Sequence, residues 1–231
     1  MLRFKGLIFD KDGTLFYFQE SWGVWLDNVL EDLSCKSIEK KRKMAKVLGF
    51  NLSKKVFFKD SPFIAGTTKQ FLSAVEPFSK NLKGAELEEF INSKLMTLTP
   101  KPVGDLRALL HYLKSKEIFI GVATNDNESP CRSQLESEKI IEFFDFIAGS
   151  DSGYGCKPET GQLEAFCQIF ELNSKDVAMI GDSTHDLIAA KKAGVYAIGV
   201  LTGVAEKKEL APYADIIFES IEDIPNYLNK I

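Results

Sequence analysis

The chain has 231 residues, of which 45% are hydrophobic and 27% are charged, proportions that exclude disordered, collagen-like and coiled-coil proteins. With Lys+Arg at 29 and Asp+Glu at 33, the formal net charge is −4. The basic excess of a non-specific nucleic-acid binder is therefore missing, and no nucleic-acid partner is expected. At roughly 150 residues per domain, the length corresponds to one large domain or two unequal ones.

The apolar runs of the sequence are short. Even residues 118–123 fall far below the roughly 20 residues that a membrane-spanning helix needs. Residues 1–6 lead into the first apolar run without a long hydrophobic segment or a cleavage site. The four cysteines contain no CxxC pair, which favours reduced thiols over a disulfide framework or a zinc site. We therefore expect a cytoplasmic protein without a membrane partner.

Strand-like and helical patterns alternate over most of the chain. Short apolar runs rich in β-branched and aromatic residues occur at 7–9, 118–123, 146–148, 177–180, 197–200 and 216–218. Apolar stripes at helical spacing lie between them, for example in residues 106–113 and 163–170. Because the strands are apolar on both faces, we predict an α/β fold with a Rossmann-like, doubly wound parallel sheet.

Residues 17–98 form a helical insert in this pattern. Apolar residues recur at helical spacing in 22–33 and again in 87–95, and no comparable strand-like run interrupts them. The chain returns through Thr99-Pro100-Lys101-Pro102, where two prolines prevent a continuous helix. We expect an all-α cap domain at 17–98, inserted into an α/β core domain made of residues 1–16 and 99–231.

Acidic side chains follow three of the predicted strands. Asp10 and Asp12 follow the first strand, Asp126 follows the second, and Asp182 and Asp186 follow the strand at 177–180. The carboxyl ends of parallel strands gather at one edge of a sheet, so these acids are expected to converge. Carboxylates about 4 Å apart repel by roughly 4 kcal/mol at an effective dielectric constant near 20, which favours a bound cation. With oxygen ligands alone, Mg²⁺ is favoured over zinc.

Each of these acids also has a simpler interpretation when it is taken alone. Asp-Gly and Asn-Asp pairs are common in turns, and Ser183 or Thr184 can cap a helix. Asp186 can complement the dipole of a helix that ends at Gly194. Their joint placement after three strands is what indicates a functional site.

The residues resemble the four motifs of the haloacid dehalogenase superfamily, in the order in which that family has them. Residues 9–15, Phe-Asp-Lys-Asp-Gly-Thr-Leu, resemble its first motif, and residues 123–125 resemble its second. Lys157-Pro158 is similar to the third motif, and residues 181–186 to the fourth. The helical insert looks like the cap of the phosphoglycolate phosphatase and β-phosphoglucomutase branch.

This resemblance implies roles for the acids. Asp10 would be the nucleophile that forms an aspartyl-phosphate, and Asp12 would protonate the leaving oxygen and later activate water. Mg²⁺ would be held by Asp10, the backbone carbonyl of Asp12, and Asp182, with Asp186 acting from behind these ligands.

The resemblance also implies a phosphate site. Thr124, the backbone of Asn125, and Lys157 would hold the oxygens of the transferring phosphoryl group. Lys11 stands at the family's variable position between the two acids, and its side chain is expected to point away from the nucleophile without a catalytic role. His185 is expected to be a solvated loop residue and His111 a structural one.

The predicted function is that of a Mg²⁺-dependent phosphatase for a small phosphorylated metabolite, such as phosphoglycolate or a sugar phosphate. A phosphomutase of the β-phosphoglucomutase type would use the same catalytic positions, and the cap would decide whether water or sugar receives the phosphoryl group. A non-enzymatic binding module on the same fold is the third alternative. The sequence identifies neither the substrate nor the oligomeric state.

Overall fold

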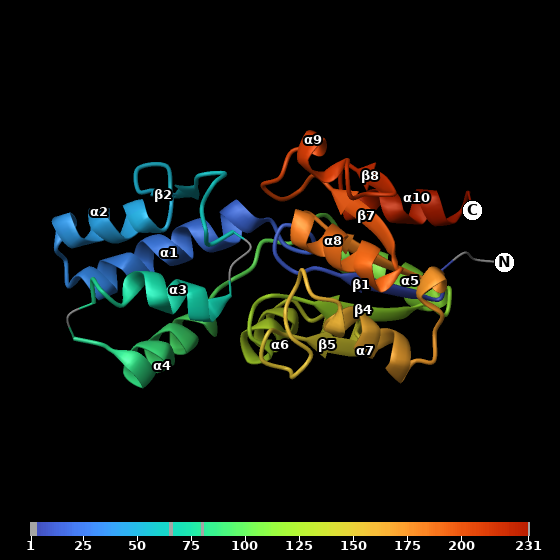
Figure 1. Cartoon of the computed structure of the whole chain (residues 1–231), viewed down its shortest axis with the longest axis horizontal. Helices are drawn as coiled ribbons and strands as arrows, with labels where there is room; N and C mark the ends of the chain where they lie inside the picture. The colour runs from blue at the N-terminus through green and yellow to red at the C-terminus, as the bar shows by residue number, and fades with distance from the viewer. Residues whose placement is uncertain (1–3, 65–66, 80, 231) are drawn as a thin grey trace. The chain divides into compact units, whose positions relative to one another are not determined.

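A parallel sheet of six strands, in the order β5-β4-β1-β6-β7-β8, organises the larger part of the chain (Figure 1). The structure is a computed structural model that describes residues 4–64, 67–79 and 81–230. The strands of this sheet are β1 (Gly6–Phe9), β4 (Phe119–Ala123), β5 (Phe146–Ala148), β6 (Val177–Gly181), β7 (Tyr196–Val200) and β8 (Ile216–Phe218). Every neighbouring pair is parallel, which confirms the predicted fold class and the six predicted strands.

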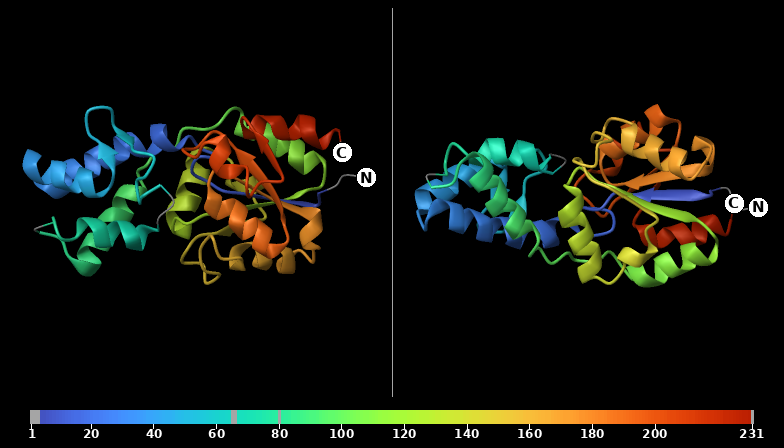
Figure 2. Two further views of the ribbon diagram at one scale, coloured as in Figure 1. Left: turned by 45° about the horizontal axis from the view of Figure 1, so that its top comes forward. Right: turned by 90° about the horizontal axis from the view of Figure 1, so that it is seen from below.

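Helices cover both faces of this sheet (Figure 2). They are α5 (Leu106–Ser115), α6 (Glu128–Ser137), α7 (Gly161–Ile169), α8 (Thr184–Ala193), α9 (Lys207–Leu210) and α10 (Ile224–Leu228). Short 3-10 turns lie at Ile141–Phe143, Ser174–Asp176 and Ile221–Asp223. In β1, Leu7 and Phe9 pack in one apolar layer with Leu110 of α5, whereas Ile8 packs in the other with Phe166 of α7. This double burial explains why the strands are apolar without interruption.

The chain divides into two compact units, one made of Met1–Phe18 with Lys101–Ile231 and one of Gln19–Pro100. The second unit holds nearly all of α1 (Phe18–Ser34), together with α2 (Ile38–Val47), α3 (Thr68–Val75) and α4 (Gly84–Leu95). It also contains a short antiparallel pair, β2 (Phe50–Asn51) and β3 (Val56–Phe57), which the expectation of an all-α insert did not include. The Asn51 side chain accepts hydrogen bonds from the backbone of Ser53 and Lys54 and so closes the turn between the two strands.

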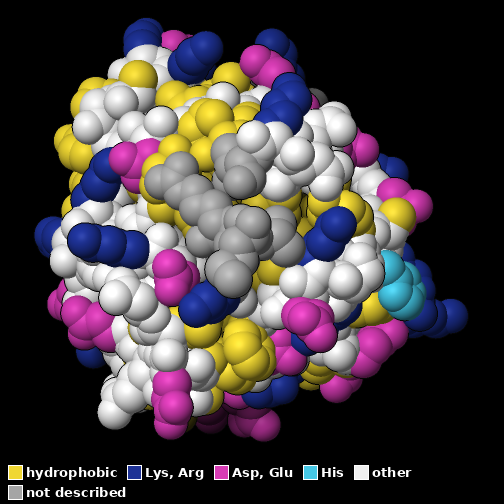
Figure 3. Space-filling model, turned by 90° about the vertical axis from the view of Figure 1, so that its right-hand side faces the viewer, with side chains coloured by type: hydrophobic (Ala, Val, Ile, Leu, Met, Phe, Trp, Pro, Cys, Tyr) yellow, Lys and Arg dark blue, Asp and Glu magenta, His cyan; other side chains and the backbone are white. Residues whose placement is uncertain are grey.

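Charged side chains of both signs are interspersed on the face of the molecule shown in Figure 3. Within the part of the chain that the structure describes, no helix is both long and apolar enough to cross a membrane.

The order of the strands determines where the functional groups meet. Strand β1 lies between β4 and β6, so the chain leaves β1 for one side of the sheet and later returns to the other side. In open α/β sheets, ligands bind at the carboxyl ends of strands where the strand order reverses in this way. The segments that follow β1, β4 and β6 are therefore neighbours at one edge of the sheet.

Candidate active site

Asp10 stands at the end of β1 and is held there by the backbone. Its N–H donates a 2.8 Å hydrogen bond to the carbonyl of Ile180 in β6, which continues the pairing of the two strands by one residue. The residue is only 8% exposed. Its Oδ1 atom accepts a 2.6 Å hydrogen bond from Nζ of Lys157. The predicted nucleophile is thus fixed in a largely water-free position beside a buried cation.

Lys157 joins two of the predicted site residues. Its Nζ atom also lies 2.6 Å from Oδ1 of Asp186, and the side chains of Lys157 and Asp186 are 3% and 1% exposed. Burial alone would lower the pKa of Lys157, but Asp10 and Asp186 outweigh burial and raise that pKa above its ordinary value. Lys157 therefore stays charged, and it holds both carboxylates in place.

Asp186 contacts both the first turn of α8 (Thr184–Ala193) and Lys157. Its Oδ2 atom accepts hydrogen bonds from the backbone N–H (3.0 Å) and the hydroxyl (2.7 Å) of Ser183. Ser183 in turn caps α8, and the two residues form a capping box. The helix ends at Gly194, as predicted, and Gly194 has the left-handed conformation, with a φ of 70°, that is common at the C-terminal cap of a helix. The capping interpretation of Ser183 is thus confirmed, and the same contacts aim Asp186 at Lys157.

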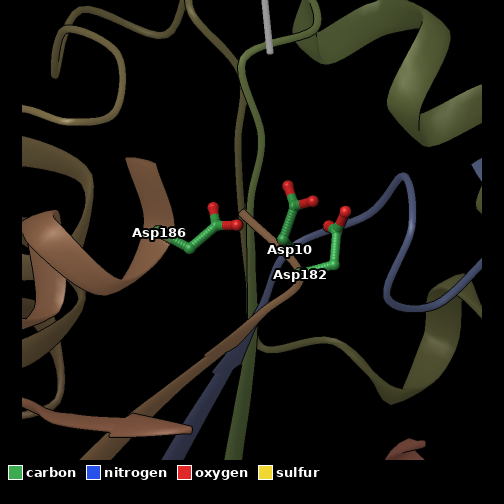
Figure 4. A group of neighbouring side chains, drawn as sticks. All are labelled: Asp10, Asp182 and Asp186. Carbon is green, nitrogen blue, oxygen red and sulfur yellow. The ribbon is translucent and has the colours of Figure 1, made fainter. Parts of the chain in front are cut away.

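Three carboxylates converge at this edge of the sheet. Asp10, Asp182 and Asp186 each offer an oxygen atom, and these atoms lie within 4.8 Å of one another; Figure 4 shows the carboxylate of Asp186 directed toward Asp10, with Asp182 on the other side. The hydroxyl of Thr14 donates a 3.4 Å hydrogen bond to Oδ1 of Asp182. Asp12 does not belong to this group of three, and its Oδ2 lies 2.5 Å from Nζ of Lys11.

The electrostatics of this cluster fit a divalent cation. Burial, together with the charge of Asp186, raises the pKa of Asp10 to about 7 despite the opposing effect of Lys157. Burial and the neighbouring charges of Asp10 and Asp186 raise the pKa of Asp182 well above its ordinary value. The raised pKa values mean that one lysine does not balance three buried carboxylates. An all-oxygen set of this kind suits a hard metal ion.

The residues after β4 hold the Lys157 segment. The amide of Asn125 donates a 2.9 Å hydrogen bond to the carbonyl of Lys157 and accepts one of 2.9 Å from its N–H. Thr124 is 3% exposed, and its carbonyl accepts a 2.9 Å hydrogen bond from the buried side chain of Gln162. These two hydrogen bonds hold the Lys157 backbone in place, and phosphate binding by the Asn125 backbone stays a prediction.

Two residues of the loop after β7 were not singled out in the sequence. Thr202 donates a 2.6 Å hydrogen bond from its hydroxyl to the carbonyl of Gly13. Gly203 packs against Asp182 so closely that a methyl group there would overlap the carboxylate. Gly13 contacts the same carboxylate and has a φ of 87°, a conformation that favours glycine. No motif contains Thr202 or Gly203, and only the parallel pairing of β6 with β7 brings their loop to Asp182.

A histidine and two lysines away from this site have structural partners. His111 packs edge-on against Phe143, with ring centroids 4.6 Å apart. In the second unit, Lys41 and Lys55 both pair with Asp27, at 2.6 and 2.9 Å, so these two lysines are engaged by a neighbouring acid.

A family model and curated relatives match large parts of this chain. The family model described as haloacid dehalogenase-like hydrolase matches residues 7–200. A phosphoglycolate phosphatase from Neisseria meningitidis is 32% identical over 111 residues, which are 48% of this chain and 47% of that protein. A phosphoglycolate phosphatase from Nitrosospira multiformis is 26% identical over 157 residues, 67% of this chain and 69% of that protein. In the first of these matches, the aligned part of the chain spans about half the length of the relative.

Solved structures share the fold over nearly the whole chain. A predicted phosphoglycolate phosphatase from Haemophilus somnus superposes with a TM-score of 0.75 at 20% identity, covering 98% of this chain and 99% of that one. A protein from Thermotoga maritima that is assigned as a β-phosphoglucomutase gives a TM-score of 0.71 at 19% identity, with 98% and 99% covered.

Proposed function

Because the chain belongs to the haloacid dehalogenase-like hydrolase family, we propose that it is a phosphatase that hydrolyses the phosphate ester of a small metabolite with the help of Mg²⁺. The observation that carries this proposal is the position of Asp10. It is a buried carboxylate at the point where the strand order reverses, held 2.6 Å from a buried lysine, with a second acid two residues further along the chain.

The proposed metal site uses the side chains of Asp10 and Asp182 and the backbone carbonyl of Asp12, with Asp186 behind them. The all-oxygen donor set and the raised pKa values of Asp10 and Asp182 support it. A bound Mg²⁺ would reduce the repulsion between the Asp10 carboxylate and the negatively charged phosphate.

The chain's own residues account for the proposed reaction in two steps. In the first, an oxygen of Asp10 attacks phosphorus, the ester P–O bond breaks, and Asp12 gives its proton to the leaving oxygen. In the second, Asp12 takes a proton from water, the water oxygen attacks phosphorus, and the bond to Asp10 breaks to release inorganic phosphate. Lys157, Thr124 and the Asn125 backbone would stabilise the charge on the phosphoryl oxygens throughout.

The proposed substrates are small phosphate esters. The names of the relatives point to small phosphate esters such as phosphoglycolate. A phosphomutase would use the same residues and would transfer the phosphoryl group to a sugar hydroxyl instead of to water. The two activities differ in their products, so inorganic phosphate is the measurement that separates them.

A phosphate-release assay over a broad panel of phosphorylated metabolites tests the proposal, with Mg²⁺ in one arm and a chelator in the other. We expect Mg²⁺-dependent release from a few small esters. Conversion of a hexose 1-phosphate to its 6-phosphate without net release would instead favour the phosphomutase. Absence of both activities, together with no effect of Mg²⁺ on the melting temperature, would support a binding module.

Mg²⁺ is expected to stabilise the chain more at alkaline than at acidic pH. In the metal-free protein the pKa of Asp10 is about 7 and that of Asp182 is raised, so the folded state binds these protons more tightly than the unfolded state. The contribution of these bound protons to the free energy of unfolding is complete below about pH 4 and is lost as the pH rises to about 7. A cation that replaces the protons should therefore raise the melting temperature by roughly 3–8 °C at pH 8, and by less at pH 5.5.

Asp182→Asn should remove this response and should melt above the unchanged chain in chelator at pH 8, because one of the repelling charges is gone. Asp176→Asn, which changes a surface acid paired with Lys5, is the matched control and should keep the full response. An equal response at both pH values would contradict the assignment of the metal site.

Gly203→Ala is expected to weaken Mg²⁺ binding. The added methyl group would overlap the carboxylate of Asp182, and the side chain must rotate or the loop must move. Changes to groups that orient metal ligands typically weaken metal affinity by about 10- to 100-fold, so the Mg²⁺ concentration that half-activates phosphate release should rise by at least about 10-fold. Lys208→Ala, at a solvent-exposed residue beyond the same loop, should leave it unchanged.

A further inference from the structure

Lys11 is a buried lysine that the proposed reaction does not use. Its side chain is 0% exposed, and side-chain oxygen atoms of three described residues lie close to its Nζ atom. They are Oδ2 of Asp12 at 2.5 Å, Oε1 of Gln134 at 2.6 Å and Oδ2 of Asp126 at 3.1 Å. Asp126 belongs to the loop after β4, and Gln134 lies on α6, so a single ammonium group connects the first motif to another part of the unit.

Burying this ammonium group is costly for the fold. Burial alone would lower the pKa of Lys11, yet Asp12 and Asp126 raise it above the ordinary value, so the group remains charged. The nearby thiol of Cys131 adds no charge, because burial raises its pKa to about 12. Replacing buried ion pairs by apolar side chains of similar volume is often neutral or stabilising. A gain in stability is therefore a poor explanation for a lysine at this position.

The contacts of Lys11 lead instead to the groups that would carry out the reaction. One partner is Asp12, the proposed acid and base. The other acidic partner, Asp126, donates its backbone N–H to the hydroxyl of Thr124 at 3.1 Å, and Thr124 is a proposed phosphate ligand. Because Lys11 binds Oδ2 of Asp12, it also fixes the direction of the other carboxylate oxygen relative to the Thr124 loop.

We propose that Lys11 is a positioning residue for the acid and base of this enzyme: it orients the Asp12 carboxylate toward the leaving oxygen by tying it to Asp126 and Gln134. This inference rests on the proposed phosphatase function. In this proposal Lys11 does not touch the substrate, so it is not a catalytic residue. It affects the reaction only through the orientation of Asp12.

The leaving group of the substrate provides the test. An alkoxide needs a proton as it departs, whereas p-nitrophenolate departs readily without one, so only alkyl esters depend strongly on a well-oriented acid. The ratio kcat/KM is the suitable measure, because it reports the steps up to departure of the leaving group. General acid catalysis typically raises the reaction rate by about 100- to 10,000-fold. A misoriented acid should lose part of this rate enhancement.

We expect Lys11→Met to lower kcat/KM for an alkyl phosphate by about 10- to 100-fold and that for p-nitrophenyl phosphate by no more than about three-fold. In an Asp12→Asn background, the same substitution should change kcat/KM for the alkyl ester by less than about two-fold, because Lys11 would act only through Asp12. Lys114→Met, which removes a half-buried ion pair with Asp145 in the same unit, is the control and should leave both substrates unaffected.

An equal loss for both substrates, no loss for either, or a full additional loss in the Asp12→Asn background would overturn the inference. If Lys11→Met does not fold, Gln134→Met replaces it, because this variant keeps the ammonium group and removes its hydrogen bond to Gln134. It should show the same selectivity at a smaller amplitude, and an unselective result would again overturn the inference. Failure of the proposed function is a separate result, namely no phosphate release by the unchanged chain from any ester of the panel.

Discussion

Asp10→Asn is expected to lower the rate of phosphate release by about 10,000-fold or more, which is the scale of losses seen when a covalent nucleophile is removed. The amide nitrogen and oxygen of Asn nearly match the shape of the carboxylate but are poor nucleophiles toward phosphorus. The raised pKa of Asp10 shows that its ionised carboxylate is unfavourable in the folded chain. Because the neutral amide removes this buried charge, the fold should be retained. Phosphate release at saturating substrate, with the circular dichroism spectrum as a check of folding, measures the effect.

The matched control for this variant is Asp145→Asn, which changes a partly exposed acid of the same unit that pairs with Lys114. It should keep phosphate release within about two-fold, apart from any modest loss of stability. A second measurement is trapping of the acyl phosphate with hydroxylamine, which should modify Asp10 in the unchanged chain during turnover. Near-normal activity in folded Asp10→Asn would end the assignment of the nucleophile.

Lys157→Met is expected to cause the largest combined loss of activity and stability. Lys157 lies 2.6 Å from both Asp10 and Asp186, and removing one partner of a buried ion pair typically costs about 3–5 kcal/mol. For a chain of this size, the melting temperature should fall by roughly 6–20 °C at pH 8. Phosphate release should fall with it, because the nucleophile and the phosphoryl oxygens lose the same cation.

Two further variants test whether the loss of stability in Lys157→Met comes from its buried ion pairs. Lys191→Met removes a solvent-exposed lysine that pairs with Asp215, and its melting temperature should change by no more than about 2 °C. Lys157→Met combined with Asp186→Asn should recover part of the lost stability, since one of the unpaired buried charges is gone. If Lys157→Met melted like Lys191→Met, the buried ion pair would not be a significant source of stability.

The fold could be predicted from the sequence because its signals are local. Each strand of the large sheet is an uninterrupted apolar run, and Gly194 ends α8 as its position after an alanine-rich helix indicates. The position of Asp10 and Asp182 at one edge follows from two facts, that both come directly after a strand and that the strands are parallel. The β2 and β3 strands were missed because each has only two residues, too few to produce an alternating pattern.

The contacts that organise the site could not be read in the same way, because they join residues far apart in the sequence. Lys11 and Gln134 are separated by 123 positions, and Lys157 and Asp10 by 147. No periodicity predicts that a lysine between two acids turns toward a helix, or that Gly203 fits against Asp182. These are properties of the packed molecule, in which the strand order selects the neighbours.

The capping box of α8 links the start of a helix to the chemistry of the site. One oxygen of Asp186 holds the first turn of α8 through Ser183, and the other holds Lys157. Opening of the first turn of α8 would therefore also break the contact between Asp186 and Lys157. A ligand that binds Lys157 and stabilises this contact would make the opening of that turn less frequent. Amide hydrogen exchange at the beginning of α8 should thus report occupancy of the site, even though these amides need not touch the ligand.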